Sequence, residues 1–138
     1  MKVFLDANIL FSAARPQSLM SRFVEKLLKH AEGCTNLYAA EEARRNLEIK
    51  QPDGLEALAR LLQHLALVAE LADVRDTGLK EKDLPILGGA VAAECSHLMT
   101  SDKKDFGKFY GQSIRGVKVV SATMMAEELE QSGLFKSK

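Results

Sequence analysis

The sequence predicts an α/β fold: a three-layer α/β/α sandwich with a central, mainly parallel sheet. Short apolar runs rich in strand-forming residues alternate along the chain with longer segments of helical periodicity, which is the pattern of such sheets. The clearest of these runs is continuously apolar, as expected of a strand buried on both faces. The chain of 138 residues carries no repeat, linker or low-complexity tract, so we expect one domain over residues 1–138.

The N-terminal half contributes one clear strand and three helical segments. Residues 3–5 form the first predicted strand, which polar residues end at once. Residues 16–33 carry apolar side chains at helical spacing, with basic residues near the end, and predict a helix. Residues 35–38 predict a brief extended piece, residues 39–48 a helix of good helix formers, and residues 55–65 a helix with a leucine stripe.

The C-terminal half contains the remaining strands. Residues 67–74 alternate apolar and polar side chains, which favours a strand, although the preceding helix could equally continue through them. Residues 83–93 have a proline in the first turn and predict a helix that packs closely through small residues. Residues 98–100 and 117–120 predict buried strands, and residues 124–129 predict a closing helix.

Composition and charge are those of a folded protein with no general attraction to polyanions. Hydrophobic residues make up 46% of the chain and charged residues 28%, which is a globular composition. Lys plus Arg and Asp plus Glu both number 19, so the formal net charge is zero. Any binding of nucleic acid must therefore come from local patches of charge.

The cysteines and the N-terminus favour a cytoplasmic location. Cys34 and Cys95 lack the paired spacing of zinc ligands, so we expect both to be small buried side chains in a reducing compartment. The N-terminal apolar run is too short for a signal peptide or a membrane span. We therefore expect no membrane partner.

Two aspartates closely follow predicted strands. Asp6 ends the first strand, and Asp102 comes just after the strand at residues 98–100. Ligand sites of open parallel sheets lie at the carboxyl ends of the strands, so we expect the two carboxylates to lie in one crevice. Taken singly, either aspartate is as readily a turn former or a helix N-cap.

Asp83 and one glutamate are the further acidic candidates. Asp83 stands at the start of the predicted helix at residues 83–93, where it can cap the helix or face the same crevice. In the helix at residues 39–48, Glu42 lies near the edge of the apolar stripe and Glu41 nearly opposite it. We expect Glu42 to reach the crevice, although a shift of one residue in register would exchange the two.

Several carboxylates in one crevice repel one another, and a hard divalent cation relieves the repulsion. Oxygen ligands suit Mg²⁺ or Mn²⁺, which can activate water and polarise a phosphoryl oxygen. Phosphodiester hydrolysis is the chemistry that such a site would perform. His30, His64 and His97 stand at no ligand spacing to one another, so zinc hydrolysis and Ser–His chemistry lack their residues.

The motifs around these acids resemble those of the PIN-domain family. Residues 3–10 resemble the opening of PIN-domain proteins, and residues 83–87 with 98–106 resemble their closing motif, so the resemblance covers most of the chain. It implies a Mg²⁺- or Mn²⁺-dependent endoribonuclease whose products carry a 5′-phosphate and a 3′-hydroxyl. The implied catalytic residues are Asp6, Glu42, Asp83 and Asp102, and the implied metal ligands are Asp6, Asp83 and Asp102.

The resemblance also implies residues that support this centre. Asn8 matches a polar residue beside the first aspartate, and either Thr100 or Ser101 matches a small hydroxyl residue before the last one. Asp105 is a secondary acidic candidate, with helix capping as the alternative. RNA phosphates would be met at the rim, where the basic residues nearest in sequence are Arg44, Arg45, Lys103, Lys104 and Lys108.

Other functions stay open at this point. A phosphotransferase of the haloacid-dehalogenase kind needs a second aspartate two residues after the first, and Asn8 stands there. A non-catalytic PIN-like module would bind RNA or protein and use its acids only structurally. Within the nuclease hypothesis, the resemblance implies a VapC-like toxin held by a small antitoxin protein, or else an RNA-processing enzyme. It also implies a homodimer, with Leu19, Phe23 and Leu27 as core or interface.

Overall fold

A computed structural model describes residues 1–134 and contains a six-stranded sheet in the order β3-β2-β1-β4-β6-β5. All neighbouring strands are parallel except β5 and β6, which are antiparallel. The strands are β1 (Lys2–Leu5), β2 (Glu32–Thr35), β3 (Ala66–Leu67), β4 (His97–Met99), β5 (Ser113–Ile114) and β6 (Val117–Val120).

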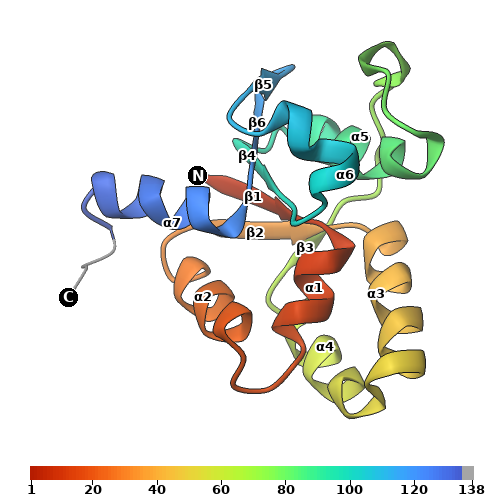
Figure 1. Cartoon of the computed structure of the whole chain (residues 1–138), viewed down its shortest axis with the longest axis vertical. Coiled ribbons are helices and arrows are strands. Elements are labelled where there is room, and N and C mark those ends of the chain that lie inside the picture. The colour runs from red at the N-terminus through yellow and green to blue at the C-terminus, as the bar shows by residue number, and fades with distance from the viewer. Residues whose placement is uncertain (135–138) are drawn as a thin grey trace.

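Helices cover both faces of this sheet, which confirms the predicted fold class. Helices α1 to α4 lie on one side of the sheet and α5 and α6 on the other (Figure 1), while α7 packs along β6. The helices are α1 (Ala7–Ala13), α2 (Leu19–Leu27), α3 (Leu37–Lys50), α4 (Leu55–Leu62), α5 (Leu84–Ala92), α6 (Lys103–Phe106) and α7 (Ala122–Gln131). Short 3₁₀ turns occur at η1 (Pro52–Gly54), η2 (Arg75–Thr77), η3 (Glu81–Asp83) and η4 (Gly107–Phe109).

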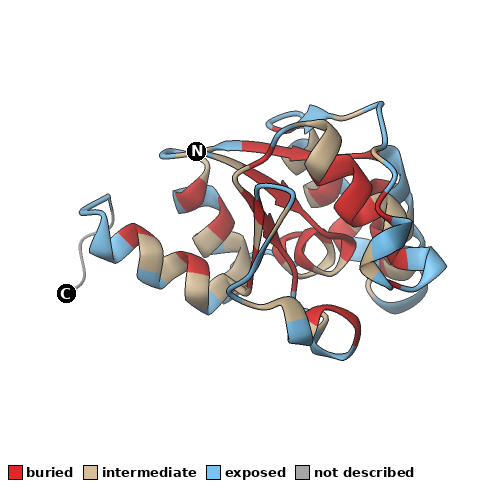
Figure 2. Cartoon of the chain, turned by 90° about the horizontal axis from the view of Figure 1, so that it is seen from above, coloured by how far each residue is buried: buried red, intermediate tan, exposed pale blue. Residues whose placement is uncertain are grey.

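The central strands form the core. Val3, Phe4 and Leu5 of β1 are 0% exposed, and so is Leu98 of the neighbouring β4. Figure 2 shows buried residues along these strands and exposed residues on the loops and outer helix faces. A strand that is apolar at every position fits this place, because helices cover it from both sides.

Polar side chains cap the starts of several helices. The side chain of Ser18 accepts from the backbone N–H of Ser21, and that of Asn36 accepts from Ala39. These bonds satisfy backbone donors that have no partner in the first turn of a helix. The side-chain amide of Asn36 also donates to the Pro85 carbonyl oxygen at 3.0 Å, which ties the start of α3 to the start of α5.

The predicted strand at residues 67–74 is wrong for most of its length. Only Ala66–Leu67 pairs with β2, and the Val68 N–H adds one bond to the Thr35 carbonyl oxygen at 2.8 Å. The residues after it run as a loop, in which the Ala72 N–H donates to the Gly88 carbonyl oxygen of α5 at 3.0 Å. The apolar residues of this loop do not share one environment, because Val74 is buried while Leu71 is 59% exposed. The extended piece predicted at residues 35–38 overlaps β2 only at Thr35, because α3 already begins at Leu37. Elements α1, α6, β2 and β5 were not predicted, since they are short or contain few strand formers.

The two cysteines are buried, as expected, at 0% and 2% exposure. Cys34 lies on β2 and Cys95 precedes β4, and their Sγ atoms are 3.1 Å apart as free thiols. None of the helices within residues 1–134 has the length and apolar character needed to cross a membrane. Of the apolar residues considered as core or interface, Leu27 is fully buried, Phe23 is half-buried and Leu19 is 83% exposed.

Candidate metal centre

The centre lies where β1 and β4 end side by side. The last paired residues of these strands are Leu5 and Met99, so Asp6 and Thr100 leave the sheet next to each other. The Asp6 N–H continues the ladder by donating to the Met99 carbonyl oxygen at 3.1 Å. Asp6 is 5% exposed and Thr100 is 0% exposed, so the site begins inside the protein.

Thr100 joins two of the predicted acidic residues. Its hydroxyl donates to Oδ2 of Asp6 at 2.7 Å and accepts from the backbone N–H of Asp102 at 3.1 Å. Of the two hydroxyl residues that the sequence left open, Thr100 is therefore the one beside Asp6, because the side chain of Ser101 is exposed. The Tyr110 hydroxyl donates to the Thr100 carbonyl oxygen at 2.9 Å, so this half-buried ring is tied to the loop after β4.

Asn8 lies beside this pair. Its side-chain amide nitrogen lies 3.3 Å from Oδ2 of Asp6 and 3.3 Å from the Thr100 hydroxyl oxygen. Its amide oxygen accepts from the backbone N–H of Ser101 at 2.9 Å. Asn8 thus connects the start of α1 with the loop after β4, and Ser101 contributes its backbone to the arrangement.

The environment of Asp6 favours its neutral form. Burial is the main cause that raises the pKa of Asp6 from 3.8 to about 6, against hydrogen bonds from Thr100 and Ala7 that lower it. The negative charges of Glu42 and Asp102 raise this pKa further. Asp6 therefore lies within electrostatic reach of both residues, as the sequence predicted for one crevice.

Asp83, Asp102 and Asp105 form a compact group in which one carboxylate oxygen of each lies within 4.8 Å of the others. Asp83 ends η3 and precedes α5, but its side chain makes no capping hydrogen bond. Its Oδ2 atom is buried and has no hydrogen-bond partner among the described residues. Asp102 does act as a cap, because its Oδ1 accepts from the Asp105 N–H at 3.0 Å.

Two lysines that the sequence analysis did not select hold Asp105. Lys80 lies 3.1 Å from Oδ1 of Asp105, and Lys82 lies 3.1 Å from Oδ2. The Asp105 side chain is only 4% exposed, whereas those of the lysines are 58% and 62% exposed. Their place in the sequence could have indicated them, since Lys82 directly precedes Asp83 and Lys80 stands three positions before it.

Within this group, the pKa of Asp105 is lowered and that of Asp83 is raised. Ion pairing with Lys80, and then with Lys82, holds the pKa of the Asp105 carboxyl well below its ordinary value. Burial, followed by the neighbouring Asp105, raises the pKa of Asp83 from 3.8 to about 7. Asp105 is therefore ionised at neutral pH, whereas Asp83 is only partly ionised there, and a bound cation would displace the proton that remains.

Glu42, and not Glu41, faces the centre. Glu42 is half-buried and lines a cleft of about 180 Å³ together with Asn8, Phe11, Asn46 and Lys50. Glu41 is exposed and pairs with Arg44 at 2.9 Å on the outer surface of α3. The register predicted from the apolar stripe of this helix is thus the one that the structure has.

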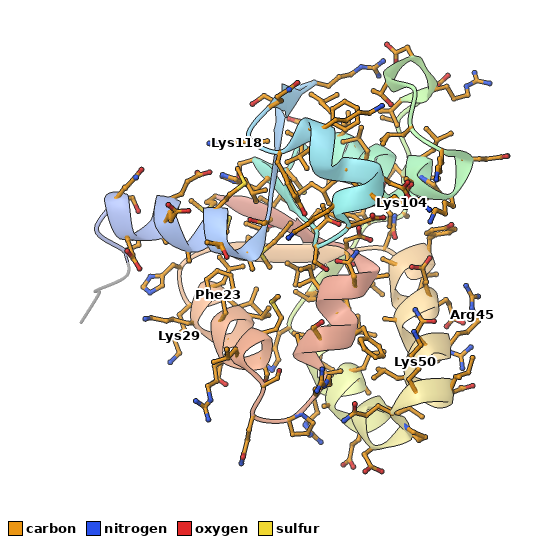
Figure 3. All side chains as sticks on the ribbon, in the orientation of Figure 1. Phe23, Lys29, Arg45, Lys50, Lys104 and Lys118 are labelled. Atoms are coloured by element: carbon orange, nitrogen blue, oxygen red, sulfur yellow. The ribbon has the colours of Figure 1, made fainter. Side chains whose placement is uncertain are left out.

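The predicted RNA-binding residues lie on α3, on α6 and in η4. Arg44 is held on the surface of α3 by Glu41 and Glu48. Figure 3 shows Arg45 pointing away from α3 and Lys104 beside α6. The basic residues that directly follow Asp102 in the sequence are the exposed Lys103 and Lys104, and Lys108 lies over the ring of Phe109.

The residues present fit a hard divalent cation. The donors are carboxylate oxygens, which Mg²⁺ and Mn²⁺ prefer. A buried oxygen of Asp83 accepts no hydrogen bond from the described residues, and burial and neighbouring negative charge raise the pKa values of Asp6 and Asp83, so a bound cation would stabilise their ionised forms. Asp6, Asp83 and Asp102 could therefore hold the cation, with Glu42 at the edge.

Comparison with known proteins supports the fold. The sequence matches no protein-family model and no curated protein sequence. In structure, the chain is similar to a chain in the crystal structure of VapBC2 from Rickettsia felis bound to a DNA fragment from their promoter. The TM-score is 0.64 at 18% identity, over 88% of this chain and 98% of that chain. At this identity the likeness concerns the fold, and the chain has the PIN-like α/β arrangement that its motifs resemble.

Proposed function

We propose that this protein is a metal-dependent endoribonuclease. The observation that carries the proposal is that Asp6, Asp83 and Asp102 lie near one another although they come from separate segments: Asp102 acts electrostatically on Asp6 and shares a group of carboxylate oxygens with Asp83. Glu42, from a further segment, also acts on Asp6. Acidic side chains with raised pKa values and an unpartnered buried oxygen are costly unless a cation binds them. A purely structural group of acids would be expected to have its buried oxygens satisfied by donors.

In this proposal, the carboxylates of Asp6, Asp83 and Asp102 hold Mg²⁺ or Mn²⁺, which when bound polarises the scissile phosphate and stabilises the leaving oxygen. Thr100 and Asn8 orient the carboxylate of Asp6 by hydrogen bonds. Glu42 faces the same cleft as Asn8 and would accept a proton from the attacking water.

The biological role that we propose is that of the toxin in a toxin-antitoxin pair. The support is the similarity in fold to a chain of the VapBC2 structure, together with the acidic site. We further propose that the chain acts in the cytoplasm, forms a homodimer, and is held inactive by a small antitoxin protein that enters the acidic groove. Sedimentation analysis would measure the dimer. Co-purification with the product of a neighbouring short reading frame would test the antitoxin.

Cleavage of labelled single-stranded RNA tests the enzymatic function. Purified wild type is incubated with the RNA in Mn²⁺ or Mg²⁺, in parallel with EDTA and with the variant Asp6→Asn. The matched control is Asp53→Asn, the same chemical change at an exposed aspartate of η1 outside the acidic centre. We expect cutting by wild type and by the control, and none in EDTA or with the Asp6 variant.

Two other results would contradict this proposal. Folded wild type that cuts no RNA and binds no Mn²⁺ in titration calorimetry would contradict the nuclease, and the acids would then be structural parts of a non-catalytic binding module. Cutting that persists in EDTA and in the Asp6→Asn variant would exclude this centre as its source.

A further inference from the structure

We propose that Lys80 and Lys82, held in place by Asp105, form the subsite that binds a phosphate of the RNA next to the metal centre. This inference rests on the proposed function and goes further, because it assigns the substrate contact to residues outside the acidic motif. It also gives Asp105 a positioning role, distinct from that of the metal ligands.

The first argument is geometric. The two ammonium groups approach the same carboxylate, each at 3.1 Å from a different oxygen. An oxygen of that carboxylate lies within 4.8 Å of oxygens of Asp83 and Asp102. The ammonium groups therefore contact the member of this group that lies beside Asp83 and Asp102. In the proposal, a phosphate bound at the metal centre extends toward them.

The second argument concerns the remaining donors. Each ammonium group has three N–H donors, and the contact with Asp105 uses one carboxylate oxygen per lysine. Both lysine side chains are more than half exposed, so donors remain for a ligand that arrives from solvent. Because Asp105 is buried and fixed, it holds these long side chains near one position and lowers the entropy lost when a phosphate binds.

The third argument is electrostatic. The centre contains several carboxylates, so the polyanionic backbone of RNA is repelled unless positive charge stands beside them. Both oxygens of Asp105 are occupied by lysines, which leaves the carboxylates of Asp83 and Asp102 in this group for a cation. Arg44, by contrast, is engaged by two glutamates of its own helix.

RNA affinity tests the inference. Fluorescence anisotropy of a labelled single-stranded RNA is measured in Ca²⁺ over a range of salt concentrations, with gel electrophoresis to verify that the RNA stays intact. For the double variant Lys80→Gln, Lys82→Gln we expect affinity to fall roughly tenfold and the slope of log affinity against log salt to decrease by about 0.7 for each lost phosphate contact. Lys80→Arg with Lys82→Arg should retain most of the affinity.

Two further variants separate phosphate binding from a structural role. The triple variant Lys80→Gln, Lys82→Gln, Asp105→Asn removes the lysines together with the charge that they neutralise, so it should fold as stably as wild type and still bind RNA weakly. The control Arg22→Gln, Lys29→Gln removes two exposed positive charges, one on α2 and one just after its end. Figure 3 shows Lys29 beside α2 and away from α6, so this variant should change the affinity little.

The outcomes distinguish this inference from the proposed function. Recovery of full RNA affinity in the triple variant, or equal losses in the α2 control, would overturn the lysine subsite while leaving the nuclease intact. Wild type that neither cuts RNA nor binds Mn²⁺ would overturn the proposed function instead. Should the double variant fail to fold by circular dichroism, the triple variant and the arginine variant still decide the inference.

Discussion

Burial gives Asp6 and Asp83 pKa values of about 6 and about 7, close to neutral pH. Carboxyl groups in this state respond both to pH and to cations, because binding of a divalent ion requires them to lose their protons. Because burial raises these two pKa values, we expect metal binding at this centre to depend on pH near neutrality.

We expect the affinity for Mn²⁺ to fall as the pH decreases from 8 to 6, and binding to release protons. The reason is that Asp6 and Asp83 must ionise, against pKa values of about 6 and about 7. Titration calorimetry in two buffers of different ionisation enthalpy measures the protons released. The variant Asp83→Asn should bind Mn²⁺ more weakly and release fewer protons, and an affinity that is constant from pH 6 to 8 would contradict the account.

Thr100→Val should weaken Mn²⁺ binding about 10- to 100-fold, as is typical when a residue that orients a metal ligand is lost. The substitution removes the hydroxyl that donates to Asp6 and accepts from the N–H of Asp102, while nearly keeping the shape of the side chain. Ser101→Ala is the control, since the Ser101 side chain is exposed. Equal effects of the two changes, measured by Mn²⁺ titration, would refute the role of Thr100.

At the scale of elements, the register of α3 decides which glutamate can act. Ala39, Ala43 and Leu47 are buried along one face of this helix, and Glu42 lies at the edge of that face. We expect Glu42→Gln to reduce RNA cleavage about 10²- to 10⁴-fold, the usual contribution of a general base, and Glu41→Gln to reduce it little. Single-turnover cleavage rates measure both, and a larger loss in the Glu41 variant would exclude this assignment.

Helix α5 brings Asp83 to the centre by packing very closely on its neighbours. A Cβ atom on Gly89 would stand 2.7 Å from the side-chain amide nitrogen of Asn36 and 3.0 Å from the ring of Phe4. We therefore expect Gly89→Ala to lower the free energy of unfolding by about 1–3 kcal/mol, the usual cost of overpacking. Gly107→Ala is the control, because its added Cβ would meet only Lys103, at 3.9 Å. Urea denaturation measures both, and equal stabilities would contradict the packing argument.

At the scale of the whole molecule, these protonation states predict how stability depends on pH. Carboxyls with raised pKa values bind protons more tightly in the folded chain, so stability falls as the pH rises from 3.8, their ordinary value, through about 7. We expect a lower melting temperature at pH 8 than at pH 5.5 in EDTA.

Saturating Mn²⁺ should reverse this loss, by about 2.7 kcal/mol at a concentration 100 times the dissociation constant. Differential scanning fluorimetry with and without the ion measures the change. The variant Asp6→Asn should show a smaller difference between the two pH values and a smaller response to Mn²⁺. A metal-free protein that is more stable at pH 8 would contradict the raised pKa values.

Much of the fold could be predicted because its signals are local. The strand at Val117–Val120 matches its prediction, and α5 differs from its prediction only at its ends, since continuous apolar runs and a proline in the first turn mark buried strands and helix starts. The end of β3 at Leu67 could not be predicted, because the apolar pattern continues to Val74 although the chain leaves the sheet and Ala72 bonds to α5.

The sequence by itself determined the fold class and singled out the acidic candidates, because periodicity and strand-end position are properties of the chain. Only the tertiary structure decided the pKa values of those residues and their hydrogen-bond and ion-pair partners. The raised pKa of Asp83, the pairing of Lys80 and Lys82 with Asp105, and the hydroxyl of Thr100 between Asp6 and Asp102 depend on burial and on distances between segments that lie far apart in sequence. Electrostatic interactions follow spatial separation and desolvation, and the folded chain sets both.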